Sequence, residues 1–294
     1  MEVTARTVAS RFLLRPDRKT NELVLGVIGR AQHLYRVRII AFTVMSNHLH
    51  ALVEVDHAAQ LAAFMQHALS NIAKEVGRHH SWLGPFWSRR YRAIVVADAA
   101  SQSARLRYVL CQGLKEGLID RVERWPGVSS FKALTTGQPL QGVWHDRSAE
   151  YEAKRRGIKP ESVETKETYQ IHLTVLPALA GVETEEYRRF VRDLVREEES
   201  SAAALRAEAG KRGVVGARRV LQENPHNTPL ESNHSPAPFV HAACGMVRTA
   251  FKTAYAAFVD AFTLAASALR AGQTADFPEG SFPPSAPFVK PAPT

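Results

Sequence analysis

Two histidines two positions apart lie in the stretch "AFTVMSNHLHALVEV", residues 41–55, just after a two-residue turn between apolar runs. Because side chains alternate between the two faces of a strand, His48 and His50 are expected on one face and Leu49 on the other. Two imidazoles about 7 Å apart along a strand can hold one metal ion. The ordinary alternative is a pair of polar side chains on a solvated sheet face.

A third metal ligand and a nucleophile are available later in the chain. Tyr108 and Gln112 are four residues apart and therefore share one face of a helix. Gln112 would offer a carbonyl oxygen to a hard divalent ion, and Tyr108 a phenolic oxygen beside that ion. Each residue alone is more often a core tyrosine or a surface amide, but their coincidence with the histidine pair favours a site. Tyr91 is the rival nucleophile, ranked lower because no residue four positions along from it can bind a metal.

Five arginines flank these residues in the sequence, and their long cationic side chains suit a phosphate backbone. Arg90 and Arg92 are expected on the same face of a strand that contains no acidic residue, which favours DNA contact over a merely solvated surface. Trp87 and Tyr91 could stack on unpaired bases, although burial is equally compatible with their type. The predicted DNA contacts are Arg89, Arg90, Arg92, Arg105 and Arg107.

The elements that must position these residues alternate between strand and helix patterns. The periodicity predicts strands at 4–14, 37–45, 48–55 and 87–95, and helices from the capping residue Asn21 to Tyr35, at 58–80 and at 99–119. This β-α-β-β-α-β-α order is that of an α+β domain with a ferredoxin-like antiparallel sheet and one additional helix.

The pattern changes after the first domain, which we assign to residues 1–135. Residues 136–182 mix charge with Gly and Pro and are expected to be a linker with irregular structure. Residues 183–272 are expected to be a mostly α-helical extension that includes a long helix at 239–270. Residues 273–294 form a Pro-rich tail.

The charge distribution points to a polyanionic partner for the first domain. The chain has 294 residues, of which 45% are apolar, and a formal net charge of +9. Residues 1–132 contain 19 Lys and Arg against 10 Asp and Glu, whereas residues 133–294 contain 19 of each. The whole positive excess therefore lies in the N-terminal part, where nucleic acid is the expected partner.

The remaining composition gives expectations about compartment and other metal sites. Two distant cysteines, Cys111 and Cys244, form no disulfide framework and fit a reducing environment. The start lacks the apolar core of a signal peptide, and no apolar run approaches the roughly 18 residues that span a bilayer. We expect a cytoplasmic protein with no membrane segment. The spacing of His226, His234, His241 and Cys244 matches no usual zinc pattern.

The motif "FTVMSNHLHALVEV", followed some sixty residues later by "ARLRYVLCQGLKEGLIDRVERWPGVSSF", resembles the single-tyrosine HUH transposases. Within them it is similar to the REP-associated tyrosine transposases of bacteria, and the resemblance covers about residues 2–132. It implies an HUH endonuclease fold with Tyr108 as the catalytic residue. It also implies that His48, His50 and Gln112 are the metal ligands, the same residues that the spacing selects.

The resemblance implies metal-dependent cleavage and rejoining of single-stranded DNA, in transposition or in the processing of repeat elements. The cofactor would be a divalent cation, Mg²⁺ or Mn²⁺, and the partner single-stranded or hairpin DNA. The intermediate would be a 5′-phosphotyrosine with a free 3′-hydroxyl, which keeps the phosphodiester energy and needs no ATP. The sequence accordingly shows no glycine loop that would cradle a nucleotide phosphate.

Two other functions compete with this interpretation. A domesticated regulator could bind repeat or hairpin DNA without cleaving it, and a metal-binding protein could have no DNA role at all. The N-terminal charge excess disfavours the second. The C-terminal helices are compatible with docking on the sheet, with hairpin recognition or with a homodimer, and the sequence does not choose among these roles.

Overall fold

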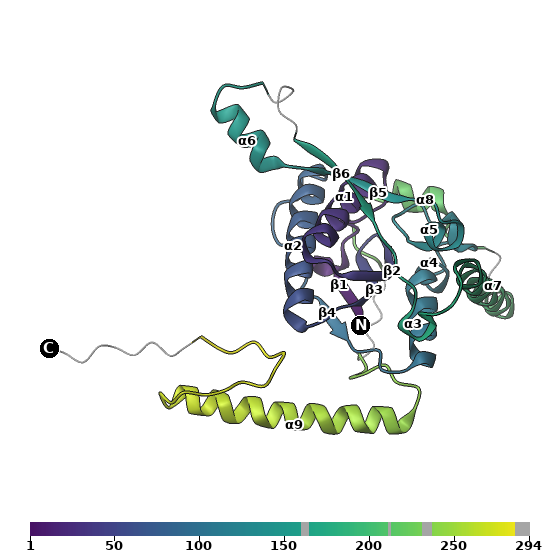
Figure 1. The fold of residues 1–294 in the computed structure, drawn as a ribbon. Helices are drawn as coiled ribbons and strands as arrows, with labels where there is room; N and C mark the ends of the chain where they lie inside the picture. The colour runs from purple at the N-terminus through teal and green to yellow at the C-terminus, as the bar shows by residue number, and fades with distance from the viewer. Residues whose placement is uncertain (160–164, 211–212, 231–236, 286–294) are drawn as a thin grey trace.

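The computed structural model describes residues 1–159, 165–210, 213–230 and 237–285. His234 and the end of the expected Pro-rich tail lie outside these ranges. Within them, a four-stranded sheet lies between helices that cover both of its faces (Figure 1).

The sheet has the strand order β2-β3-β1-β4, and every neighbouring pair is antiparallel. Its strands are β1 (Glu2–Arg6), β2 (Arg38–Val44), β3 (His48–Glu54) and β4 (Arg92–Ile94). The connecting helices are α1 (Arg18–Tyr35), between β1 and β2, and α2 (Ala58–His79), between β3 and β4. This is the βαββαβ topology of a ferredoxin-like sheet. The predicted α+β class and antiparallel sheet are confirmed.

Two apolar cores cover the two faces of the sheet. On one face, α1 and α2 pack against alternate strand residues such as Leu49. On the other face, α3 (Ala99–Leu110) and α7 (Thr184–Glu208) pack against residues of the opposite phase, such as Leu52. In Figure 1 the two helix layers lie on either side of the strands. Residues of β3 that alternate in sequence therefore face different environments.

The first strand and the first helix differ from the predicted boundaries. β1 ends well before residue 14, because the chain turns at Ala9 and Ser10, whose φ angles of 49° and 55° are left-handed. The cap of α1 is Asp17 and not Asn21: its Oδ1 accepts a hydrogen bond from the backbone N–H of Thr20 at 2.7 Å. The helix therefore begins four residues, just over one turn, earlier than expected.

β4 contains three residues, whereas the alternating pattern predicts a strand over 87–95. Trp87 makes only an isolated bridge with Thr7, and its indole N–H donates to the carbonyl of Leu69 in α2 at 2.8 Å. The indole is thus part of the α2 packing. Arg90 lies outside the strand, so the predicted common strand face of Arg90 and Arg92 is wrong.

The helix predicted over 99–119 is divided. α3 begins after Asp98, whose Oδ1 accepts from the backbone N–H of Ser101 at 2.8 Å, and ends before Cys111. Cys111 has φ −98° and ψ 17°, outside helical geometry, and a short helix α4 (Gln112–Lys115) follows. Cys111 is only 4% exposed, so the break lies inside the core and not at the surface.

The irregular linker expected over 136–182 is an ordered hairpin. Its strands β5 (Leu140–His145) and β6 (Lys166–Ile171) pair antiparallel, and α6 (Arg147–Arg155) lies between them in sequence. The hairpin packs on α1 at Gly26, where an added Cβ would collide with the backbone carbonyl of Val143. Gly26 is therefore required by close backbone contact.

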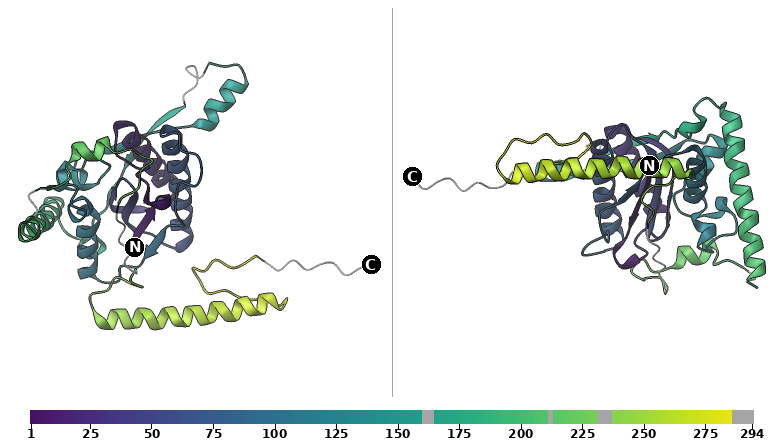
Figure 2. Two further views of the ribbon diagram at one scale, coloured as in Figure 1. Left: turned by 180° about the vertical axis from the view of Figure 1, so that it is seen from behind. Right: turned by 90° about the horizontal axis from the view of Figure 1, so that it is seen from below.

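The region beyond the hairpin is mostly helical, as predicted. Besides α7 it contains α8 (Ala217–Gln222) and α9 (Gly245–Arg270), while α5 (Phe131–Thr136) closes the first domain. α9 begins later than the predicted helix at 239–270 and extends beyond the rest of the fold (Figures 1 and 2). Among the helices of the described ranges, none is long and apolar enough to cross a membrane.

Candidate functional site

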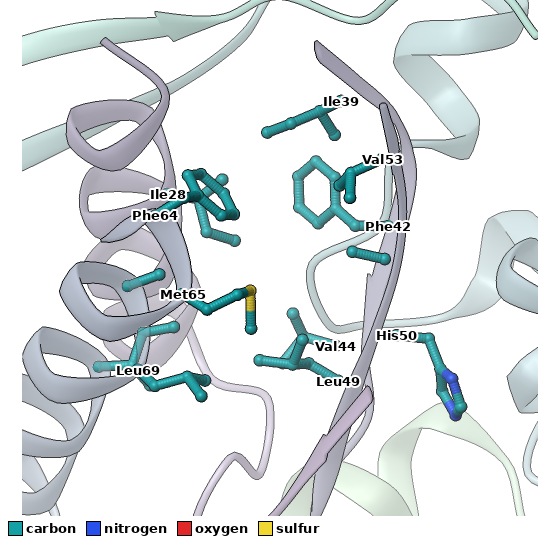
Figure 3. A pocket seen from close by; sticks show the side chains of 13 residues that line it. Ile28, Ile39, Phe42, Val44, Leu49, His50, Val53, Phe64, Met65 and Leu69 are labelled. Atoms are coloured by element: carbon teal, nitrogen blue, oxygen red, sulfur yellow. The ribbon is translucent and has the colours of Figure 1, made fainter. Parts of the chain in front are cut away.

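His48 and His50 lie side by side on the face of β3 that is covered by α3. Their rings meet edge to face with centroids 4.9 Å apart, and the residues are 5% and 6% exposed. Figure 3 shows His50 on the opposite side of the sheet from Leu49 and from the apolar side chains of the α1/α2 core. The predicted common face is confirmed, although it is buried and not solvated.

The neighbouring strand β1 contributes a second row of polar side chains to the same face. Antiparallel pairing places Thr4 opposite His50 and Arg6 opposite His48. Glu2, two residues earlier, belongs to the same row. The alternation of polar and apolar residues in "EVTAR" contains this signal, but alternation alone does not reveal which strands pair and so does not connect these residues with the histidines.

Both Nδ1 atoms of the histidine pair already have polar partners. His50 Nδ1 lies 3.1 Å from Thr4 Oγ1 and 3.4 Å from Glu2 Oε1. His48 Nδ1 lies 2.6 Å from Asn47 Oδ1. The carboxylate and amide oxygens accept hydrogen bonds and so favour a proton on each Nδ1, which leaves the lone pair of each Nε2 free for a metal.

Burial sets the charge state of the pair. It lowers the pKa of His48 well below its ordinary value, and the nearby His50 acts in the same direction. Burial also lowers the pKa of His50, while the hydrogen bond to Glu2 opposes that shift. Both rings are therefore neutral near pH 7, which is the form that binds metal ions.

Tyr108 and Gln112 converge on the histidines in spite of the helix break. The Tyr108 ring lies edge to face with His50, with centroids 5.2 Å apart. Gln112 is 1% exposed, and its Nε2 donates to the carbonyl of Tyr108 at 2.7 Å. The Gln112 side chain also lies close enough to His48 to oppose part of the lowering of the His48 pKa. The amide oxygen is thus directed to the histidine pair.

Two cations flank the Tyr108 ring. The Arg105 guanidinium carbon and the Lys115 Nζ each lie 4.6 Å from the ring centroid. Lys115 Nζ also donates to the Tyr108 hydroxyl at 3.5 Å. The phenolic oxygen therefore lies in a positive environment that would stabilise an adjacent phosphate.

The predicted DNA-contacting arginines have different environments. Arg105 faces the site, whereas Arg107 turns to α7 and forms an ion pair with Glu197 at 2.9 Å. This pair argues against Arg107 as a DNA contact, because its charge is already matched by a carboxylate. The other three predicted residues are exposed: Arg89, Arg90 and Arg92.

Tyr91, the rival nucleophile, belongs to the other side of the sheet. It is half-buried against the α1/α2 core, and the guanidinium of Arg90 lies 5.4 Å from its ring centroid. Tyr108 contacts the histidine pair and Tyr91 packs in the opposite core, so the geometry favours Tyr108 as the nucleophile.

The C-terminal region contributes residues that the sequence analysis did not assign to the site. An open hollow beside α3 is lined by Arg105 together with His241, Arg248 and Lys252. The last two belong to the first turns of α9, where their spacing of four residues places them on one face. Three cations around one hollow suit a phosphate backbone.

One other cluster has the composition of a metal site. Ligand atoms of Asp17, His79 and His80 lie within 4.8 Å of one another, at the start of α1 and the end of α2. The Asp17 carboxylate already caps α1 and pairs with Arg15 at 2.8 Å. This cluster is not formed by the strand that carries His48, so it is separate from the tyrosine site.

The family model described as "Transposase IS200 like" matches residues 9–112, about a third of the chain. No curated protein matches. A solved structure, that of a REP-associated tyrosine transposase bound to a REP hairpin, is similar with a TM-score of 0.36 and 17% identity, over 46% of this chain and 79% of that one. The matched range contains both histidines, Tyr108 and, as its last residue, Gln112.

Proposed function

We propose that residues 9–112, which match the model of the IS200-like transposases, form a transposase domain, and that the chain cleaves and rejoins single-stranded DNA through Tyr108. The observation that carries the proposal is the convergence of a tyrosine on a buried, neutral histidine pair, with the Tyr108 and His50 ring centroids 5.2 Å apart. The sheet, α3 and α4 hold these groups in a fixed arrangement.

The donor atoms suit a divalent cation. Two neutral imidazoles and one amide oxygen, from His48, His50 and Gln112, would hold Mg²⁺ or Mn²⁺, and the two nitrogen ligands favour Mn²⁺. When bound, such an ion would polarise the scissile phosphate and stabilise its developing charge. Water or DNA oxygens would complete the coordination, since three protein ligands leave positions open.

Tyr108 supplies the nucleophile. Its phenolic oxygen releases its proton to solvent water and attacks phosphorus, and the bond from phosphorus to the 3′-oxygen breaks. The 3′-oxygen takes up a proton and leaves as a free hydroxyl, while the 5′-phosphate remains on the tyrosine. Lys115 and Arg105, beside the ring, stabilise the phenolate and the phosphate oxygens. Attack by a 3′-hydroxyl reverses the step and rejoins DNA, so no ATP is required.

The DNA path follows the positive charge. The basic hollow formed by Arg105, Arg248 and Lys252 adjoins the α3 face, and Arg90 and Arg92 are exposed near β4. These side chains would contact phosphates, which explains the N-terminal charge excess. Single-stranded or hairpin DNA is the proposed substrate, as in the family that the motifs resemble.

The test uses hairpin oligonucleotides labelled at either end, incubated with the full chain and Mn²⁺. A 3′-end label should become covalently attached to the protein, whereas a 5′-end label should leave on a fragment that ends in a 3′-hydroxyl. Chelation of the ion with EDTA should prevent both events. DNA binding without any adduct, over a panel of hairpins, would contradict the proposal and support the non-catalytic regulator.

A further inference from the structure

Glu2 is a buried carboxylate beside the histidine pair and has three cationic or N–H partners. It is 5% exposed, and its oxygens lie 3.4 Å from His50 Nδ1, 2.8 Å from His241 Nε2 and 3.5 Å from an Arg105 nitrogen. Burial raises the pKa of Glu2, but the close contacts with His241 and His50 outweigh it and lower the pKa well below its ordinary value. The contacts with His50, His241 and Arg105 therefore offset part of the cost of burying the carboxylate.

His241 reaches Glu2 from the C-terminal region. Its backbone N–H donates to the carbonyl of Val95, and its own carbonyl accepts from the N–H of Ala97, both at 2.9 Å. The N–H of Cys244 donates to Asp98 Oδ2 at 3.0 Å. Residues 239–244, which we call the strap, are thus fixed to the segment that leads into α3.

The contacts that fix the strap also link it to α3, the helix that contains the nucleophile Tyr108. Asp98 holds the strap with one carboxylate oxygen and caps α3 with the other. α3 carries Tyr108, so the position of the strap and that of the catalytic helix depend on one residue. The side chain of His241 is 12% exposed, and its Nε2 lies 2.8 Å from Glu2 Oε2. This is a close polar contact without hydrogen-bond geometry, and within the described ranges both atoms are buried without a hydrogen-bond partner.

We propose that Glu2 and His241 are positioning residues for His50, and that the strap therefore completes the metal site from outside the transposase domain. The carboxylate of Glu2 accepts the Nδ1 proton of His50, which directs Nε2 to the ion. His241 holds that carboxylate in place. The inference rests on the proposed function, since it assigns these residues to the metal site of His48 and His50. Neither Glu2 nor His241 lies in the range 9–112 that the family model matches.

The physical basis is the effect of outer partners on a metal ligand. A carboxylate that accepts the second N–H of a ligating histidine fixes its tautomer and ring orientation, and losing it costs about 10- to 100-fold in metal affinity. Without His241, the remaining cation near Glu2 Oε2 within the described ranges would be Arg105, at 3.5 Å. The Glu2 carboxylate could then turn away from His50.

The first measurement is the Mn²⁺ affinity of the full chain, by titration calorimetry. Glu2→Gln should weaken binding by about 10- to 100-fold, and His241→Phe, which keeps a ring of similar size, by about 10-fold, the lower end of that range. His226→Phe is the matched control, because His226 also lies in the C-terminal region but contacts the carbonyl of His80 and not Glu2. It should bind Mn²⁺ like the wild type.

The second measurement reads the tautomer of His50 in the metal-free chain by ¹H–¹⁵N NMR of the imidazole nitrogens. The wild type should carry the proton on Nδ1, and both Glu2→Gln and His241→Phe should shift His50 to a mixture of tautomers. His48, whose Nδ1 is held by Asn47, provides an internal control and should not change. A merely structural role of His241 would leave the His50 tautomer as it is.

The outcomes separate this inference from the proposed function. Failure of the wild type to bind Mn²⁺ would overturn both. Wild-type binding, together with a His241→Phe variant that keeps the wild-type affinity and His50 tautomer, would overturn the inference alone. Should His241→Phe not fold, His241→Asn, which is too short to reach Glu2, takes its place with the same expected weakening and tautomer shift.

Discussion

Tyr108 and Gln112 belong to different helices, yet a hydrogen bond from Gln112 Nε2 to the Tyr108 carbonyl, 2.7 Å long, joins them across the break at Cys111. This bond occupies the amide nitrogen, and the Gln112 side chain also interacts with His48. The nucleophile and the third candidate ligand are therefore held as one unit.

Replacing Gln112 with Leu should separate metal binding by Gln112 from nucleophilic attack by Tyr108. Gln112→Leu keeps much of the buried volume but removes the carbonyl oxygen, so Mn²⁺ affinity should fall by more than about tenfold, since even an outer partner of a ligand costs that much. Tyr108→Phe keeps the ring and should retain the wild-type affinity. Calorimetric titration of both variants is the measurement, and equal affinity of Gln112→Leu and the wild type would remove Gln112 from the ligand set.

The different environments of the arginines predict that their replacement changes the salt dependence of DNA affinity to different extents. Each phosphate contact on single-stranded DNA contributes roughly 0.7 to the slope of log affinity against log salt, so replacing exposed Arg90 and Arg92 by Ala should flatten the slope by about one to two units. Arg107→Ala should leave the slope nearly unchanged, because Arg107 is paired with Glu197. Fluorescence anisotropy over a series of salt concentrations measures both slopes. An equal flattening by Arg107→Ala would show that its ion pair opens on DNA.

Local periodicity in the sequence was sufficient to predict the elements that position the site and the residues that these elements bring together. The alternation in β3 predicts that His48 and His50 share a face, and the spacing of Tyr108 and Gln112 survives the helix break because the side-chain bond to the backbone restores it. The sheet topology follows from the order of elements, since few βαββαβ arrangements satisfy the connection rules.

Features that depend on contacts between distant segments could not be predicted in the same way. The hairpin β5–β6 is stabilised by packing on Gly26, more than 110 positions before it, and in isolation the mixture of Gly and charged residues in this segment resembles a linker. The partnership of Glu2 with His241 depends on a bridge between Val96 and His241 that no local pattern indicates. Alternation overestimated β4 because Trp87 is held by α2 instead.

The close contact at Gly26 predicts a stability effect. Gly26→Ala places a Cβ against the Val143 carbonyl, so the hairpin must shift, and the free energy of unfolding should fall by about 1–3 kcal/mol. Gly181→Ala is the control, because a Cβ there meets no atom within 4 Å. Chemical denaturation of the two variants measures the difference, and similar stabilities would contradict the hairpin packing.

Buried histidines predict a loss of stability in mild acid. Burial, followed by the nearby His79, lowers the pKa of His80 from 6.5 to about 4. Between these values the unfolded chain binds a proton that the folded chain does not, so the free energy of unfolding should decrease as the pH falls through this window. The lowered pKa values of His48 and His50 act in the same direction.

Denaturation of the chelator-treated protein at several pH values between 7 and 4 tests this dependence. His80→Gln should lessen the decrease, whereas His33→Gln, at an exposed position of α1, should follow the wild type. Identical curves for His80→Gln and the wild type would show that His80 does not titrate as its burial implies.

The central claim is that Tyr108 forms the covalent bond to DNA, and mass spectrometry of the trapped adduct tests it most directly. Trypsin would release Tyr108 in a peptide that ends at Lys115, and Tyr91 in the dipeptide that ends at Arg92. We predict a nucleotide on the Tyr108 peptide, no adduct with Tyr108→Phe and an undiminished adduct with Tyr91→Phe. A nucleotide on the Tyr91 peptide, or an adduct formed by Tyr108→Phe at the wild-type rate, would contradict the account.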